Sequence, residues 1–148
     1  MKRITALLIL LSLLILTACE QKKSPEDILY EFMTEYPISA NIYSSLCDEE
    51  DAGYISEEML AAVFGTSEPP TAEFALILYG KVDKVIEVGV FDVGGGDGIG
   101  LTELITRRIS FLSSFAEGEG FIKKYRGVLV YGFVRDAAYA EEIFDRIL

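Results

Sequence analysis

The sequence predicts an α+β fold, in which helices cover a small antiparallel or mixed sheet of about three or four strands in a two-layer sandwich. Three apolar runs of strand length, at residues 74–79, 85–91 and 128–134, supply the sheet. Segments with apolar residues at helical spacing surround them, in the order helix, helix, strand, strand, helix, strand, helix. Because the first two strands are close in sequence, we expect them to pair as an antiparallel hairpin.

The first two helices are predicted from their end signals. Ser24 caps one, since serine is a good N-cap and the proline after it suits the first helical position, and Pro37 ends it. Ser56 caps a second, short helix that stops at Gly65. Segment 38–46 between them is compatible with either a strand or a short helix.

The third helix is the clearest, and a glycine-rich loop at 92–98 precedes it. Its apolar residues recur at helical spacing and share one face. This face consists of Leu101, Leu104, Ile105, Ile109, Leu112 and Phe115. Gly118 and Gly120 break the helix, and Asp136 caps the last helix of the chain.

The amino-terminal segment has the three parts of a secretory signal peptide: basic residues at 2–3, an apolar run at 4–16, and small residues before a cleavage site. A cysteine follows directly, so the motif resembles the lipobox of bacterial lipoproteins. It consists of Leu16, Thr17, Ala18 and Cys19. The resemblance implies that Cys19 becomes the lipidated first residue, anchored to the outer face of the cytoplasmic membrane.

The sequence therefore divides into a signal peptide at 1–18, the lipidated cysteine with a short tether at 19–24, and one extracytoplasmic domain at 25–148. An uncleaved membrane anchor is disfavoured, because the apolar run 4–18 has 15 residues and a spanning helix needs about 20. The short tether places the domain close to the membrane surface.

Composition excludes several function classes. Removing the signal peptide takes away two basic residues and no acid, so 13 basic residues fall to 11 against 24 acidic ones, a formal charge of −13. Such a surface repels phosphate backbones and anionic lipid headgroups, and we expect no nucleic-acid partner. Attachment to the membrane is therefore expected to come from the lipid and not from a basic patch. The chain contains no histidine, so neither a Ser-His-Asp nor a Cys-His arrangement is possible. We expect no cofactor and no metal, and we assign no catalytic residue.

Two individual residues, Glu87 and Cys47, are considered for a chemical role. Glu87 lies within an otherwise apolar strand, where an acid with a raised pKa could serve catalysis. The favoured interpretation is that it pairs with water, Arg107 or Arg108. Cys47 has no disulfide partner once Cys19 carries lipid, and we expect it to be a small buried apolar residue.

Three polar stretches are expected to be structural or solvated. The loop at 92–98 lacks the glycine spacing of a phosphate-binding loop and the acid pattern of an EF-hand, so it is predicted to be a mobile connection. The acidic run at 48–51 is predicted to be a solvated loop. Lys123, Lys124 and Arg126 could face lipid headgroups or an acidic partner, but a solubilising edge beside the third strand is favoured.

Four features together resemble a family of short lipoproteins from clostridia and related Gram-positive bacteria that carry a C-terminal domain of unknown function. They are the motif at 16–19, a strand ending in phenylalanine at 86–91, arginines at 107–108 in the next helix, and a glycine opening the strand at 127–130. The resemblance covers roughly residues 69–134 and implies no activity and no further site residue.

Two functions remain after these exclusions. The favoured hypothesis is a non-enzymatic, lipid-anchored domain that binds an envelope protein or other envelope component near the membrane. The alternative is a carboxylate- or calcium-dependent envelope enzyme or ligand binder, with Glu87 as the acid to test.

Overall fold

The computed structural model describes residues 22–148 except 69, 82–83 and 97. The predicted signal peptide, the motif at 16–19 and the lipidated Cys19 lie outside the described residues. Within the part that is described, no helix is both long enough and apolar enough to cross a membrane.

The described chain forms four helices and five strands. The helices are α2 (Pro25–Glu35), α3 (Glu57–Phe64), α4 (Ile99–Ser113) and α5 (Ala137–Ile147). The strands are β1 (Ile42–Ser44), β2 (Glu73–Lys81), β3 (Lys84–Asp92), β4 (Glu119–Tyr125) and β5 (Val128–Val134).

The strands form one open sheet in the order β1-β2-β3-β5-β4, and every neighbouring pair is antiparallel. The predicted α+β class is confirmed, and so is the β2–β3 hairpin. The predicted number of strands, three or four, is too low. Segment 38–46 contributes the short edge strand β1, and β4 is the strand that the sequence did not predict.

Strand β4 escaped prediction because it lacks the apolar run of an interior strand. Its sequence is Glu-Gly-Phe-Ile-Lys-Lys-Tyr, and only Phe121 is buried. Gly118 and Gly120 precede this residue, and they had suggested only the end of a helix. Lys123 and Lys124 lie in β4, the edge strand that pairs with the third predicted strand, so their predicted position beside that strand is confirmed. Charged residues on an edge strand discourage pairing with other chains.

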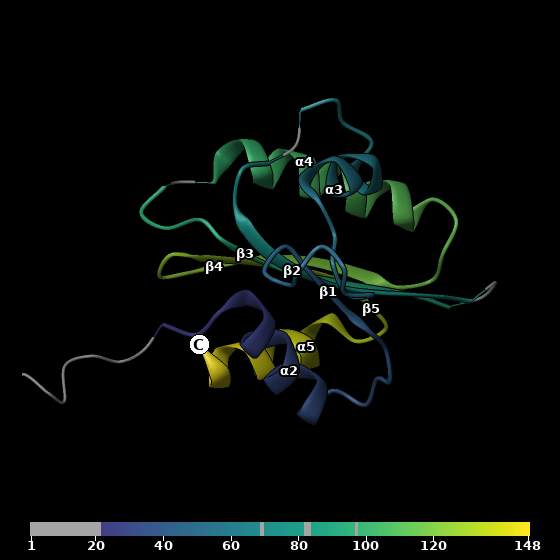
Figure 1. Ribbon diagram of the computed structural model, residues 1–148. Helices are drawn as coiled ribbons and strands as arrows, with labels where there is room; N and C mark the ends of the chain where they lie inside the picture. Colours follow the sequence, from purple (N-terminus) through teal and green to yellow (C-terminus); the bar gives the residue numbers. More distant parts are fainter. Residues whose placement is uncertain (1–21, 69, 82–83, 97) are drawn as a thin grey trace, which may run out of the picture.

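Helices cover both faces of the sheet: α2 and α5 lie on one side and α3 and α4 on the other (Figure 1). The fold thus has three layers, and the predicted two-layer arrangement is wrong. The physical reason lies in β5, where all seven residues are buried. A strand that is apolar on both faces needs a covering layer on each.

Each face of the sheet has its own apolar core. Val88, Val90 and Val130 point toward α2 and α5, where Phe32 and Phe144 stack with ring centroids 4.6 Å apart. The opposite core lies under α3 and α4. It contains Leu60, Phe64, Phe74, Leu76, Phe91, Leu101, Ile105, Leu129 and Tyr131.

The predicted end signals of α2, α3 and α5 are confirmed, whereas α4 ends at Ser113, before the predicted stop at Gly118 and Gly120. The Ser24 hydroxyl accepts a hydrogen bond from the Asp27 N–H, and the Asp27 carboxylate accepts one in return, which forms a capping box. Ser56 and Asp136 cap α3 and α5 in the same way, by accepting from the N–H three residues on. Gly65 ends α3 with a positive φ of 64°.

One expectation for α4 is wrong. Leu101, Ile105 and Leu112 are buried as predicted, but the helix ends at Ser113 and Phe115 is 59% exposed. Phe115 therefore lies outside the packed face.

A glycine in β3 makes room for the fully buried side chain of Tyr131. Gly89 lies directly opposite Tyr131 in the β3–β5 ladder. A Cβ atom on Gly89 would overlap the Tyr131 ring and would lie 2.7 Å from Leu76 Cδ2. The ring thus occupies the space that any other residue at position 89 would need.

We predict that Gly89→Ala lowers the free energy of unfolding by about 1–3 kcal/mol, because the added methyl group overpacks the core. Gly80→Ala is the matched control, since Gly80 lies in the adjacent strand β2 and an added Cβ meets no atom within 4 Å. The free energy of unfolding of this control should change by at most about 0.5 kcal/mol. Urea unfolding followed by circular dichroism measures both values, and equal losses would contradict the packing argument.

Candidate functional site

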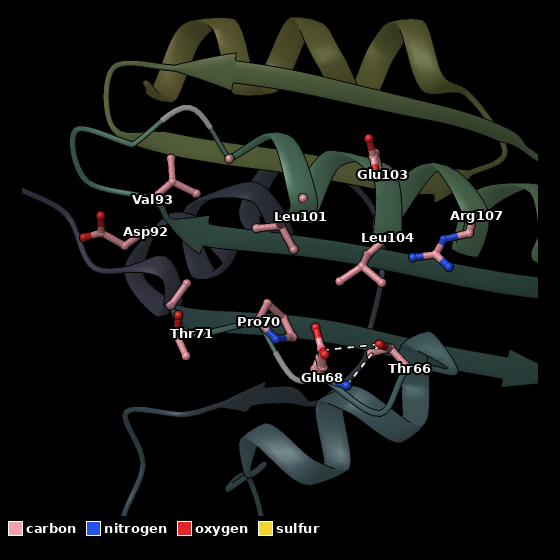
Figure 2. A pocket seen from close by; sticks show the side chains of 13 residues that line it. Thr66, Glu68, Pro70, Thr71, Asp92, Val93, Leu101, Glu103, Leu104 and Arg107 are labelled. Carbon is pink, nitrogen blue, oxygen red and sulfur yellow. Dashed lines mark hydrogen bonds between the residues drawn. The ribbon is translucent and has the colours of Figure 1, made fainter.

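A surface cleft lies at the end of the sheet where β2 begins and β3 ends (Figure 2). Its walls are the first part of α4, residues 66–68 and 70–72 between α3 and β2, and residues 92–93. Its volume is about 520 Å³. A concave surface of this size is the usual shape of a small-ligand or peptide site.

The lining combines apolar and polar side chains. Leu101 and Leu104 point from α4 toward Pro70 on the opposite wall (Figure 2). The polar and charged lining residues are Thr66, Glu68, Thr71, Asp92, Glu103 and Arg107. Apolar contacts with a few polar groups give a ligand both contact area and orientation.

Two glycines shape the helix ends beside the cleft. Gly65 ends α3, and Gly98, with a φ of 64°, is the N-cap residue of α4. Both adopt the left-handed conformation that glycine reaches without steric cost. Thr66, the residue after Gly65, stabilises the local conformation of the cleft wall, because its hydroxyl accepts a hydrogen bond from the Glu68 N–H at 3.2 Å.

An ion pair joins the tether to the edge of the cleft. Lys22 Nζ lies 2.6 and 2.5 Å from the two carboxylate oxygens of Asp92. This bond is the main reason that the pKa of Asp92 is lowered, and the Gly94 N–H, which donates to Asp92 Oδ1 at 2.9 Å, adds to it. Asp92 is therefore an anion that already has a cationic partner.

Arg107 is available to a ligand. Among the described residues its guanidinium makes no ion pair, and its side chain lines the cleft. Glu68 and Glu103 line the same cleft without an ion pair in that part of the chain. The cleft therefore offers charges of both signs.

Glu87 has a different environment from the cleft residues. It is 2% exposed and faces α4, where Arg108 donates from Nε at 3.0 Å and from Nη2 at 2.7 Å. The Tyr131 hydroxyl donates to the same carboxylate at 2.8 Å. The favoured interpretation is thus confirmed for Arg108 and not for Arg107.

Because Glu87 and Tyr131 are buried, the cluster of Glu87, Arg108 and Tyr131 is a structural element and not an open site. Removing one member of a buried ion pair leaves an uncompensated charge and is strongly destabilising. Burial, and then the Glu87 carboxylate, raise the pKa of Tyr131 well above its ordinary value, so the phenol keeps the proton that it donates. A substrate would have to displace both donors to reach Glu87.

The glycine-rich loop runs from the end of β3 to α4 and is held at several points. The Val93 N–H donates to the Gly127 carbonyl at 3.0 Å, and Lys124 Nζ donates to the Gly96 carbonyl at 3.0 Å. The expectation that the loop is mobile and binds no ligand stays a prediction. The structure adds that it lies beside the cleft and against the β4–β5 turn.

The acidic run at 48–51 forms an exposed turn, in which the Asp51 N–H donates to the Asp48 carbonyl at 2.9 Å. Its predicted solvent exposure is confirmed. In the residues that the structure describes, no group of three or more acidic or cysteine side chains could hold a metal ion.

Cys47 is half-buried, whereas a buried position was expected. Burial raises the pKa of the thiol, and the nearby carboxylates of Glu26, Asp51 and Asp48 raise it further. A thiol in acidic surroundings forms little thiolate and is a poor nucleophile.

The basic residues at 123–126 have separate environments. Lys123 pairs with Asp145 at 2.7 Å and lies 3.6 Å from Glu141, both on α5. Arg126 is exposed in the turn between β4 and β5. The expected solubilising role at the edge of the sheet therefore fits Lys123.

Sequence reasoning missed the cleft and an exposed aromatic pair. The cleft joins residues from three separate segments, and no local pattern marks it. Phe111 and Phe115 are 57% and 59% exposed, with ring centroids 5.1 Å apart. Phe111 lies within α4, and Phe115 lies just past the end of this helix at Ser113, which the helical spacing did not reveal.

No family model, no curated protein and no solved structure shows a significant match to this chain. The resemblance to clostridial lipoproteins therefore stays a prediction, and the functional argument depends on the geometry.

We predict that Tyr131 makes stability depend on alkaline pH. The pKa of Tyr131 is raised in the folded protein, so the protonated phenol contributes fully to the free energy of unfolding below the unfolded-state pKa of about 10. This contribution is lost as the pH rises above that value. The free energy of unfolding falls by about 1.4 kcal/mol per pH unit until the pH reaches the Tyr131 pKa of the folded protein. The stability difference between wild type and Tyr131→Phe should therefore narrow between pH 10 and 11 by about that amount.

Tyr30→Phe is the control for this measurement, because the Tyr30 ring is 57% exposed. Its difference from wild type should stay constant over the same pH range. Urea unfolding at pH 9, 10 and 11 gives all three curves, and a constant gap for Tyr131→Phe would disprove the assignment.

Proposed function

We propose that this protein is a lipid-anchored extracytoplasmic domain that binds a protein or another envelope component close to the membrane and is not itself an enzyme. The observation that carries the proposal is the ion pair between Lys22 and Asp92. It attaches the chain three residues after Cys19 to a residue that lines the cleft.

The tether geometry supports a role near the membrane. Three extended residues span at most roughly 11 Å. Lys23 adds a second attachment, because its Nζ donates to Glu31 Oε2 at 2.7 Å and to the Ile147 carbonyl at 2.9 Å. A cleft held this near the lipid attachment point can reach only components at or next to the bilayer.

The cleft chemistry supports a ligand that carries both charges. Arg107 suits a carboxylate or phosphate, while Glu68 and Glu103 suit an ammonium or guanidinium group. Leu101 and Leu104 add apolar contact area. A short peptide segment with charged and apolar side chains combines these features, whereas a polyanion does not.

Binding is favoured over catalysis because the two reactive candidates are unsuited to it. Two donors already occupy the Glu87 carboxylate, and the acidic surroundings of Cys47 raise the pKa of its thiol. No specific feature of the geometry favours the alternative, a carboxylate- or calcium-dependent enzyme or ligand binder.

The lipid anchor is tested by Cys19→Ala. We expect wild type to have a mature amino terminus at Cys19 carrying acyl chains, and the variant to lack both the lipid and this cleavage. Cys47→Ala is the matched control and should be processed like wild type. Intact-mass and amino-terminal peptide spectrometry measure the outcome, and a wild-type chain that retains residues 1–18 would refute the anchor.

The cleft is tested by photo-crosslinking in native membranes. A photoreactive residue at Thr71 lies in the cleft, whereas one at Thr34 lies on α2, on the opposite face of the sheet. We expect a discrete adduct from position 71 that position 34 does not give.

Arg107→Ala should reduce this adduct about tenfold or more, because a charge-assisted hydrogen bond is lost. Arg135→Ala removes an exposed arginine elsewhere and should leave the yield unchanged. If positions 71 and 34 gave the same adducts, or if Arg107→Ala had no effect, the cleft would not be the binding site.

A further inference from the structure

We propose that the cleft binds an extended peptide segment in which a lysine and an acidic residue stand two positions apart. The inference rests on the proposed function, because it names the class of ligand for the same cleft. It uses a second hollow on the other flank of α4, with a volume of about 510 Å³. The second hollow is lined by Thr102, Glu103, Thr106 and Arg107.

Glu103 and Arg107 form a ridge between the cleft and the second hollow, because both residues line both concavities. Successive helical residues point about 100° apart, so Leu104 lies on the cleft side of the ridge and Thr102 and Thr106 lie on the other side. In Figure 2 the Glu103 carboxylate points away from the opposite wall of the cleft. A ligand in the cleft therefore reaches the second hollow by crossing one ridge.

The two charges of this ridge are available to a ligand. Glu103 and Arg107 are exposed and have the i,i+4 spacing at which opposite charges can pair on a helix. Neither makes an ion pair with any residue that the structure describes, and their charged ends point apart in Figure 2. Exposed pairs at this spacing stabilise a helix only slightly, so a ligand that binds both charges displaces no strong interaction.

The second hollow presents hydrogen-bond acceptors. The Thr102 hydroxyl donates to the Gly98 carbonyl at 3.0 Å, and the Thr106 hydroxyl donates to the Thr102 carbonyl at 2.8 Å. Each hydroxyl has a single hydrogen, so both accept from a ligand. Together with the Glu103 carboxylate they suit an ammonium group, which has three donors and no acceptor. The flexible four-carbon stem of a lysine carries this group across the ridge.

The cleft side of the ridge suits the opposite charge. The Arg107 guanidinium has its donors in a planar fork, which binds both oxygens of a carboxylate. Asp92, at the edge of the cleft, is already paired with Lys22. The ligand cation is therefore directed to Glu103, and the ligand carboxylate to Arg107.

Helix geometry fixes the spacing of the two ligand charges. Glu103 and Arg107 are four residues apart, which is about 6 Å along α4. In an extended peptide, side chains two positions apart share one face and lie about 7 Å apart, whereas those four positions apart lie about 13 Å apart. Adjacent side chains point to opposite faces, so the residue between the two charges faces Pro70 and Thr71 on the opposite wall.

The test is the fluorescence anisotropy of labelled peptides added to the full-length lipidated protein in detergent micelles at physiological salt. Three capped peptides of alanine and threonine carry a lysine and a glutamate two positions apart, a lysine and a glutamate side by side, or two lysines two positions apart. The third peptide measures the general attraction of an acidic protein for basic peptides. We expect the first peptide to bind about tenfold more tightly than the other two, because each of these loses a charge-assisted hydrogen bond.

Two variants test the two sides of the ridge. Glu103→Lys should weaken binding of the first peptide about tenfold and shift the preference to a peptide with two glutamates. Thr106→Val removes an acceptor of the second hollow and keeps the branched shape, so it should weaken the first peptide about fivefold. Glu49→Lys makes the same charge change in the exposed turn at 48–51 and should leave the order of affinities unchanged.

Failure of this inference differs from failure of the proposed function. If no peptide binds, if the second or third peptide binds as tightly as the first, or if either ridge variant leaves the first peptide unaffected, the ligand class is wrong. The proposed function stands in that case as long as position 71 gives its Arg107-dependent adduct. If position 71 gives no adduct of its own, the proposed function fails, and the inference fails with it.

Discussion

The need to cover the central strands on both faces organises this molecule. Strand β5 is buried at every position, and β3 beside it is buried at Val88, Val90 and Phe91. A sheet of this kind cannot leave one face in water, so helices must be supplied to both sides. In the part of the chain that the structure describes, the first and last helices, α2 and α5, lie on one face and α3 and α4 on the other. The termini of the domain therefore meet, and the tether begins beside the carboxyl end of α5.

Helix α4 links the core to the candidate site. Successive residues on a helix point about 100° apart, so the neighbours Arg107 and Arg108 have separate roles. Arg108 turns inward to Glu87, the one acid buried in the described residues, while Arg107 reaches the cleft. The buried pair fixes the helix against the sheet, and a helix fixed in this way presents Arg107, Leu101 and Leu104 in a defined arrangement. Packing and binding are thus coupled through one element.

The sequence predicted what is encoded locally. The caps at Ser24, Ser56 and Asp136 depend on residues within one turn, and the apolar runs of β2, β3 and β5 are strong enough to identify without tertiary context. Features that depend on distant segments were missed. Strand β4 has exposed lysines because it is an edge strand, which is a property of the sheet and not of the segment. Periodicity identifies an apolar face but not the layer that it joins, and the cleft exists only after three segments meet. The signal peptide and Cys19 lie outside the described residues and stay predictions.

The close fit between glycines and neighbouring side chains has a consequence for how this sequence can diverge. Gly89 accommodates the ring of Tyr131, Gly132 that of Phe121, and Gly120 the side chain of Ile109. In each pair the two residues share one volume, so neither can change size alone without creating a clash or a void. Homologous chains should therefore show correlated substitutions at these pairs, with a larger residue at the glycine position accompanied by a smaller partner. Such covariation would identify the fold in relatives whose overall similarity has been lost.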